Sequence, residues 1–300
     1  MAPSRAQDQP RPRPFAEATS TRRTARRLLD DRLPGRETAD GHGVRLTLVL
    51  AVVILLTAAV STYALGTGLY SILVLLSVDS LWADLAAYAL MGFLGIFVLL
   101  PLAAGTYRLA CLAARTVDHT AASQQSGPSL PSVEESPELY GIFHPFTSLR
   151  AYGRSLCVGL EWLLWGVLIV GVPAIGYRLP ALLGVYLPEW GLSPVAIGWL
   201  TTLAPIACTV FGIAMLVLSG LRAGYAYFVF IHAPLTLGEI NRYFRGFRRS
   251  LLRPLALRVS LLGWVAVSIL AILVPFVLHT VPYALCCSTA YAAALKRNTH

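Results

Sequence analysis

The sequence predicts an all-α, polytopic membrane protein, a bundle of about six transmembrane helices. Three observations support this fold class. The chain of 300 residues is 56% hydrophobic and only 13% charged, whereas soluble domains carry about 25% charged residues. Its apolar residues gather in runs long enough to cross the roughly 30 Å hydrocarbon core of a bilayer. The basic residues fall almost entirely on one side of these runs, which is typical of inserted helices.

A basic segment, residues 1–44, precedes the first apolar run. Its first 18 or so residues are rich in Pro, Arg and Gln, and we expect them to be disordered because they offer little apolar surface to bury. Residues 19–33 are expected to form a short helix capped by Ser20 or Thr21. The segment is therefore predicted to be mostly disordered and to lie in the cytoplasm.

Two long apolar runs follow. The first begins after Arg45 and carries no charged residue as far as Leu65, which is long enough to span hydrocarbon at 1.5 Å per residue. The second begins beyond a polar break at Asp79 and Asp84 and contains Pro101. A membrane helix tolerates an internal proline when a neighbouring group bonds the carbonyl oxygen that the proline leaves free.

The rest of the chain is expected to supply four more spans. The third run ends before a proline-rich stretch with Tyr186 and Trp190, which indicates a loop at the membrane surface. The last apolar block is too long for one span and is broken by Pro275 and Pro282, so we interpret it as two full spans or a re-entrant pair. The predicted transmembrane domain, residues 45–296, has spans at about 46–66, 87–110, 156–176, 197–222, 255–277 and 281–296.

Basic residues are distributed unevenly around these spans. Six spans place both termini on one side, and all of the 24 Lys and Arg residues except Arg178 fall on that side. Cytoplasmic loops carry an excess of Lys and Arg. We therefore expect a multi-pass protein of the plasma membrane with cytoplasmic N- and C-termini.

An amphipathic helix is predicted over residues 238–254, between the fourth and fifth spans. Its apolar face consists of Ile240, Tyr243, Phe244, Phe247 and Leu251. Its basic residues are Arg242, Arg245, Arg248, Arg249 and Arg253. Such a helix lies flat on a membrane, with its rings in the acyl boundary and its guanidinium groups among anionic headgroups. Residues 138–156, before the third span, have a similar aromatic and basic character.

Two other ligands were weighed for the helix over residues 238–254. Aromatic and arginine residues together also suit single-stranded nucleic acid. The helix is tethered between two spans without a folded basic domain, however, so no nucleic-acid partner is expected. A specific site for a phosphate-bearing ligand remains the other alternative.

Two charged residues fall inside predicted spans at similar depth. Glu161 lies in the third span and Arg222 near the end of the fourth. An intramembrane carboxylate is a functional candidate by default. We expect Glu161 and Arg222 to form an ion pair. The alternatives are that Glu161 reaches the membrane surface alone, or that it couples to a proton or a substrate.

Catalytic motifs are not recognisable. The sequence has no nucleotide-binding loop, nucleophile elbow or metal-ligand spacing. The five cysteines lie in or beside apolar runs and are interpreted as small buried hydrophobic residues. We therefore expect no catalytic residues, no metal, no cofactor and no enzymatic activity.

The chain resembles a bacterial family of integral membrane proteins with about six spans and no established activity. The segments that resemble the family are "PLAAGTYRLACLAAR" (101–115), "ELYGIFHPFTSLRAYGRSL" (138–156), "YAYFVFIHAPLTLGE" (225–239) and "VPYALCCSTAYAAAL" (281–295). The resemblance covers about residues 87–296. The stretch "YFRGFRRS" is shorter than its counterpart in the family, and residues 179–222 look like an extension. The resemblance implies a topology and no mechanism.

Three functions are compatible with this sequence. The first is a non-catalytic component that organises the membrane by contacting anionic lipids at the cytoplasmic face, with a protein partner or a second copy as a further possibility. The second is a small-solute permease or channel that uses Glu161 and Arg222. The third is a membrane enzyme for lipid-linked substrates, which is the weakest because the loops on the inner side are basic and lack clustered Asp, Glu or His.

Overall fold

The computed structural model describes residues 14–29, 43–123, 139–178, 193–232, 235–245, 253–261 and 276–297. These residues form helices joined by turns, and the described parts contain no β-strand. Four helices in them are long and apolar enough to cross a membrane: Val44–Leu75, Ser80–Ala114, Leu149–Arg178 and Ile197–Ile231. The all-helical class is thus confirmed, and the four apolar helices indicate a membrane protein.

The two remaining predicted spans are not among these four. Most of the fifth, 255–277, lies outside the described residues, although 253–261 are helical. The sixth corresponds to α11 (Val281–Arg297), which has 17 residues. Its length is about 26 Å, which is short for a roughly 30 Å hydrocarbon core. Much of α11 is also buried inside the protein, including Cys286, Cys287 and Ala292.

The first two membrane helices form one arm of the structure. Helix α2 (Val44–Leu75) runs antiparallel to α3 (Ser80–Leu94), which continues through η1 (Gly95–Leu99) into α4 (Leu100–Ser123). Asp79 caps α3, because its carboxylate accepts a hydrogen bond of 2.8 Å from the Leu81 amide. Gly66 lets α2 approach α3, since a Cβ at that position would lie 2.4 Å from Met91 Cγ.

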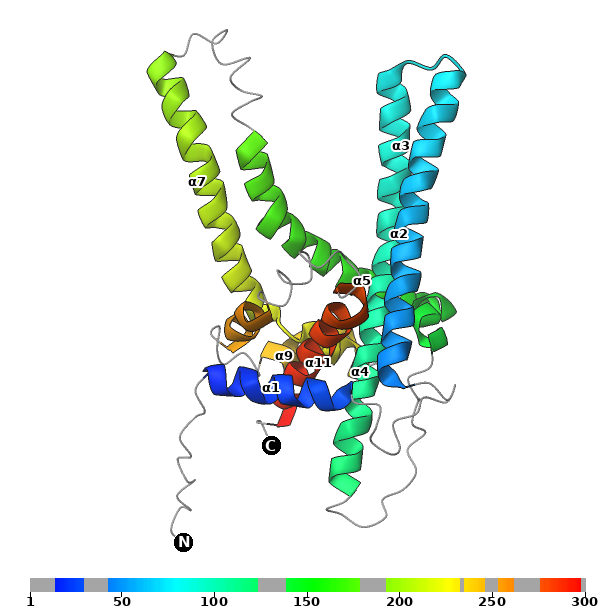
Figure 1. The fold of residues 1–300 in the computed structure, drawn as a ribbon, viewed down its shortest axis with the longest axis vertical. Coiled ribbons are helices and arrows are strands. Elements are labelled where there is room, and N and C mark those ends of the chain that lie inside the picture. The colour runs from blue at the N-terminus through cyan, green and yellow to red at the C-terminus, as the bar shows by residue number, and fades with distance from the viewer. Residues whose placement is uncertain are drawn as a thin grey trace.

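The other two membrane helices form a second arm. Helix α5 (Leu149–Gly166) continues through η3 (Val167–Gly171) to Arg178. Helix α7 (Pro194–Leu218) returns along it and leads into η5 (Ser219–Arg222) and α8 (Tyr225–Ile231). Gly212 permits close packing in this arm, because a Cβ there would lie 2.5 Å from Pro173 Cγ. The two arms diverge from a common lower end in Figure 1.

Three prolines each follow a π-helical turn by two residues. The turns are η1, η3 and η6 (Phe276–Thr280), and the prolines are Pro101, Pro173 and Pro282. A proline has no amide hydrogen for the carbonyl four residues earlier, so the preceding turn widens by one residue. At Pro101 the freed carbonyl is that of Phe97, and it accepts a hydrogen bond of 3.0 Å from the Tyr152 hydroxyl. Helix α5 thus supplies the bond that this proline removes.

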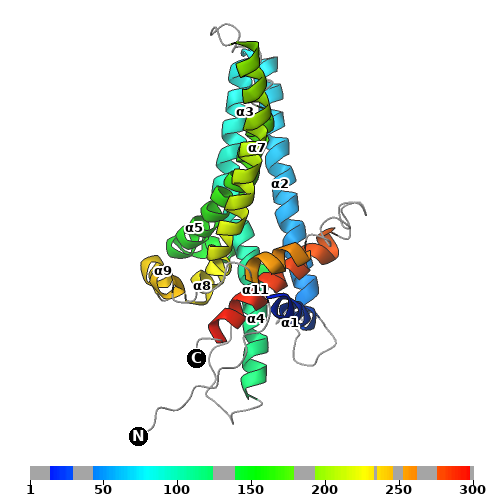
Figure 2. The same cartoon turned by 90° about the vertical axis from the view of Figure 1, so that its left-hand side faces the viewer.

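The buried core lies at the lower end of the arms, here called the base. It contains α1 (Pro14–Leu28), the start of α2, the middle of α4, α8, α9 (Leu237–Arg245) and α11. In Figure 2, turned by 90°, these elements again lie below the arms. Higher in the arms, large apolar side chains such as Val60, Phe93 and Val210 are exposed. This distribution suits arms surrounded by lipid and a base that packs against itself.

Helix α1 occupies part of the segment predicted to be disordered. It begins at Pro14, so Ser20 and Thr21 lie inside the helix and do not cap it. Ala25 is fully buried, and Arg22 Nε donates a hydrogen bond of 3.0 Å to the Tyr283 hydroxyl of α11. The prediction of disorder is therefore wrong for residues 14–18, which extend this docked helix, while 1–13 and 30–42 lie outside the described residues.

Candidate functional site

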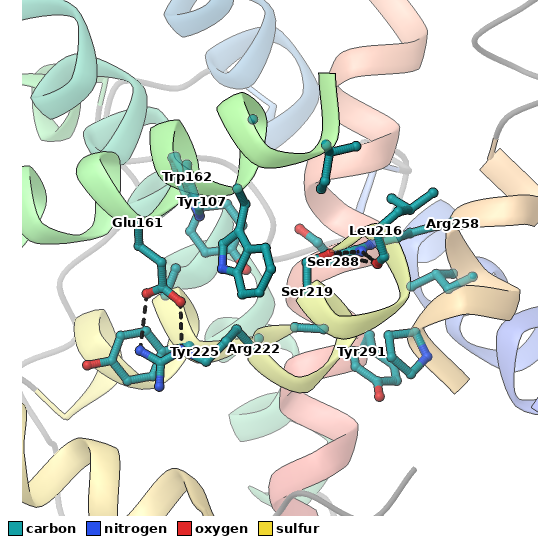
Figure 3. A pocket seen from close by; sticks show the side chains of 18 of the residues that line it. Tyr107, Glu161, Trp162, Leu216, Ser219, Arg222, Tyr225, Arg258, Ser288 and Tyr291 are labelled. Atoms are coloured by element: carbon teal, nitrogen blue, oxygen red, sulfur yellow. Dashed lines mark hydrogen bonds and ion pairs between the residues drawn. The ribbon is translucent and has the colours of Figure 1, made fainter. Parts of the chain in front are cut away.

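An ion pair joins the two halves of the second arm where it meets the base. Arg222 Nε lies 2.7 Å from Glu161 Oε1, and Arg222 Nη2 donates to Glu161 Oε2 at 3.3 Å. This two-bond arrangement fixes the guanidinium plane as well as its position. The side chains are 25% and 18% exposed, respectively, so the pair is only partly withdrawn from its surroundings. The structure therefore brings the two predicted intramembrane charges together (Figure 3).

Two further residues hold the Arg222 guanidinium. Arg222 Nη1 donates a hydrogen bond of 2.7 Å to Asn241 Oδ1 on α9. Its Cζ lies 3.8 Å from the centre of the Tyr225 ring, in cation–π contact. The sequence analysis identified neither partner. Tyr225 follows Arg222 by three residues, a helical spacing that could have suggested it, but the position of Asn241 depends on the chain path after α8.

Gly224 makes this clustering possible. Its φ of 86° lies in the left-handed region, which glycine adopts without the steric cost of a Cβ. This residue turns the chain from η5 into α8 directly after Arg222. A Cβ on Gly224 would also lie 2.9 Å from the Ala292 Cβ of α11. The turn therefore brings α8 against α11 and directs Arg222 toward α5.

A cavity and a groove meet at the ion pair. The cavity, of about 410 Å³, lies between α5, η5, the helix 253–261 and α11. The groove, of about 720 Å³, runs along α5 and the end of α7 and is more open. Both are lined by Glu161, Trp165, Arg222 and Tyr225. The remaining residues of the groove are Cys157, Leu160, Leu164, Leu218 and Leu221.

A second arginine, absent from the predicted site, lines the cavity. Arg258 Nη1 donates a hydrogen bond of 2.9 Å to the Leu216 carbonyl and another to Ser219 Oγ. Arg258 falls at the start of the predicted span 255–277, and the sequence analysis gave it no role. Figure 3 shows it on the side of the cavity away from Glu161. Cationic groups from two different helices thus face one space.

The predicted amphipathic helix is shorter than expected and packs differently. Helix α9 ends at Arg245, and residues 246–252, which include Arg248 and Arg249, lie outside the described residues. Arg242 and Arg245 are exposed, whereas Arg253 is partly buried at the start of the helix 253–261.

The apolar face of α9 is directed toward the protein. Ile240 and Phe244 are buried, and the Phe244 ring lies edge-on to Phe228 and Tyr225, with ring centres 5.3 Å and 5.5 Å apart. The prediction that the apolar face of this helix enters the acyl boundary is therefore wrong for Ile240 and Phe244, which are buried in a cluster with residues of α8. The protein thus holds α9 in place, and Arg242 and Arg245 of this helix remain exposed.

A capping box starts α9. Glu239 Oε2 accepts hydrogen bonds of 2.7 Å from both the amide and the hydroxyl of Thr236, and the Glu239 amide donates to Thr236 Oγ1 at 3.3 Å. These bonds favour the carboxylate and hold the pKa of Glu239 below its ordinary value. The spacing in "TLGE" carries the usual signature, which the sequence analysis missed. Nearby, Arg154 Nη2 donates to the Leu235 carbonyl and fastens this turn to α5.

Metal-ligating and thiol groups are sparse in the described parts of the chain. These parts contain no group of three or more His, Cys, Asp or Glu residues placed to hold a metal ion. Cys111, Cys286 and Cys287 are buried as expected, and Cys208 is partly buried. Cys157 differs from the expectation, because it is exposed in the groove.

Comparison with known proteins gives no match: no family model fits the chain, and neither a curated protein nor a solved structure is found to be similar. The resemblance described above therefore rests on the sequence pattern alone.

Proposed function

We propose that this protein is a non-catalytic component of the plasma membrane that binds anionic lipid at the cytoplasmic surface, with both termini in the cytoplasm. The observation that carries the proposal is the arrangement of α9. Its apolar residues are fixed against α8, and Arg242 and Arg245 point outward at the level where the arms meet the base. Basic residues held close to an anionic membrane surface contribute about 1 kcal/mol each.

The placement of α9 supports a binding role that does not depend on insertion. A helix that inserts its aromatic face must leave the protein or tilt away from it. Helix α9 is instead tied to the second arm through Asn241 and Arg222, and its first turn is fixed by Thr236 and Glu239. Its two guanidinium groups therefore stay at a constant height relative to the membrane helices.

The test measures the preference of the whole protein for anionic lipid. The purified chain is placed in nanodiscs of phosphatidylcholine alone or mixed with phosphatidylglycerol, and its thermal unfolding is followed. Phosphatidylglycerol should stabilise the parent protein, and added salt should reduce the effect. In Arg242→Gln/Arg245→Gln the stabilisation should fall by about 2 kcal/mol.

Arg242→Lys/Arg245→Lys provides the matched control, because it keeps both positive charges at the same positions on α9. This variant should respond to phosphatidylglycerol as the parent does. Equal stabilisation of all three proteins, or a parent that does not distinguish the two lipid compositions, would contradict the proposal.

A permease or channel is the second candidate, and one observation favours it. The Glu161–Arg222 pair lines both the cavity and the groove, so breaking the pair would widen the passage between the two spaces. Proton uptake into proteoliposomes under an imposed potential tests this function. The candidate requires uptake by the parent protein and its loss in Glu161→Gln, and a parent without uptake of protons eliminates proton coupling at this pair.

A further inference from the structure

The charge in the cavity is unbalanced. Three charged side chains line it: Glu161, Arg222 and Arg258. Glu161 and Arg222 neutralise each other through two hydrogen bonds. The two bonds of Arg258 go to a carbonyl oxygen and a hydroxyl, and no carboxylate of the described residues pairs with it. The lining thus carries a net charge of about +1, which a ligand with one negative charge would balance.

Arg258 also has hydrogen-bonding capacity left for a ligand. A guanidinium group has five N–H donors, and Nη1 supplies both of the bonds that Arg258 makes. Nε and Nη2 make no bond to the residues that the structure describes. These two nitrogens lie on one edge of the guanidinium plane, the edge that binds two oxygens of a phosphate or carboxylate side by side.

The depth of the site matches a lipid headgroup. The helix from Glu161 to Arg178 rises about 26 Å at 1.5 Å per residue. With Arg178 at one surface of a hydrocarbon core about 30 Å thick, Glu161 lies close to the opposite surface. The cavity beside Glu161 is therefore at the boundary between headgroups and acyl chains.

The walls of the site change from polar to apolar. Arg258, Ser219 and Ser288 lie on one side of the cavity, and Trp165 links it to the groove. Four of the nine residues that line the groove are leucines, of which Leu164 is 57% exposed. An amphiphile with a small charged head and an apolar tail would fill both spaces, whereas a free anion would leave the groove empty.

We propose that this cavity binds the headgroup of a phospholipid with one net negative charge, such as phosphatidylglycerol. Its phosphodiester oxygens accept hydrogen bonds from Nε and Nη2 of Arg258, and an acyl chain follows the groove between α5 and α7. The site rests on the proposed lipid-binding function and deepens it, because it distinguishes one retained lipid from the looser layer that α9 attracts.

The experiment counts retained lipid on the full chain. The protein is purified from membranes in mild detergent, washed extensively, and analysed by native mass spectrometry. The parent should retain one phosphatidylglycerol per chain. Arg258→Gln should reduce the retained fraction at least tenfold, and Arg258→Lys should restore it only partly, because lysine keeps the charge but lacks the planar fork.

A second variant fills the cavity without changing its charge. Gly166 lines the cavity, and a Cβ built on it meets nothing within 4 Å. Gly166→Leu should therefore displace the lipid while Arg258 and the fold remain intact. If Arg258→Gln is unstable, Gly166→Leu alone tests whether the cavity binds the lipid headgroup.

The possible outcomes separate the site from the proposed function. Retention of phosphatidylglycerol by Gly166→Leu at the parent level overturns the site, as does retention by a folded Arg258→Gln. Arg242→Gln/Arg245→Gln should keep the retained lipid and lose only the general stabilisation by anionic lipid. A retained fatty acid, or complete displacement of the lipid by inorganic phosphate, would also overturn the assignment.

Discussion

At the scale of single residues, the Arg222 guanidinium is the most heavily partnered cation in the described site. It contacts α5 through Glu161, α9 through Asn241 and the ring of Tyr225 beside it. An arginine held from three directions cannot turn toward solvent when one partner is lost. Removing a partner therefore leaves a positive charge that is poorly compensated. The resulting loss of stability exceeds the net contribution of the Glu161–Arg222 ion pair itself.

We predict that Glu161→Gln lowers the free energy of unfolding by about 1–2 kcal/mol. This is less than a fully buried pair would lose, because both side chains are partly exposed. The double variant Glu161→Gln/Arg222→Gln should be more stable than the sum of the single variants implies. Reversible unfolding in detergent measures this coupling, and strictly additive effects would mean that the pair contributes nothing.

The capping box makes the stability of α9 depend on pH. Because the folded state holds the pKa of Glu239 below its ordinary value, the contribution is fully present above that ordinary value, about 4.3. It is lost as the pH falls through the lower pKa of the folded state. The stability difference between the parent and Glu239→Gln should therefore narrow in acid. A difference that is constant from neutral pH to pH 3 would argue against this cap.

At the scale of elements, close contacts decide how the helices are spaced. Gly105 of α4 lies against η2 (Leu139–Thr147), and a Cβ there would lie only 2.2 Å from the Ile142 carbonyl oxygen. Backbone atoms cannot yield as a flexible side chain can. The 3₁₀ turn that leads into α5 therefore depends on a glycine in a different arm.

We predict that Gly105→Ala destabilises the protein by about 1–3 kcal/mol, the usual cost of overpacking. Gly92→Ala in α3 is the matched control, because a Cβ at Gly92 meets nothing within 4 Å. The control should be neutral or slightly stabilising, since alanine favours a helix. Thermal unfolding of both variants in the same nanodiscs provides the comparison. Similar unfolding midpoints would show that η2 can shift to make room for the added methyl group.

Elements were predictable where a local pattern determines them. The four long apolar helices follow from hydropathy, and Pro101 was expected to need a neighbour, which is Tyr152. Helix α11, predicted as a span, is not among these four, and its small apolar residues suit burial in protein as well as in lipid. Counting residues from the helix ends put Glu161 and Arg222 at similar depth, and they meet in the structure. Arg258 was missed because its place depends on long-range packing.

At the scale of the whole molecule, charge and shape are arranged along one axis. The base holds α1, α9 and α11, and the arms extend away from it to Arg178 at the far end. The exposed apolar side chains of the arms require lipid, whereas the base has its own buried core. Insertion with the base in the cytoplasm would place the basic residues where membrane insertion favours them.

This orientation predicts a labelling pattern. In a variant with Cys157 and Cys208 replaced, single cysteines at positions 125 and 247 should be protected from a membrane-impermeant maleimide in intact cells. Cysteines replacing Ser80 and Ser193, at the far ends of the arms, should react. Reaction at 125 and 247 in intact cells, or opposite results at these two positions, would refute the proposed topology.

The docking of α1 on α11 joins residues 261 positions apart, Arg22 and Tyr283. Helix α1 leaves the ribosome before the four membrane helices, and α11 leaves it after them. Helix α1 therefore remains undocked outside the ribosomal exit tunnel until all four apolar helices have inserted into the bilayer. It can dock only after the four apolar helices have been synthesised, and a chain arrested before residue 281 would expose the Ala25 face of α1 to chaperones and proteases.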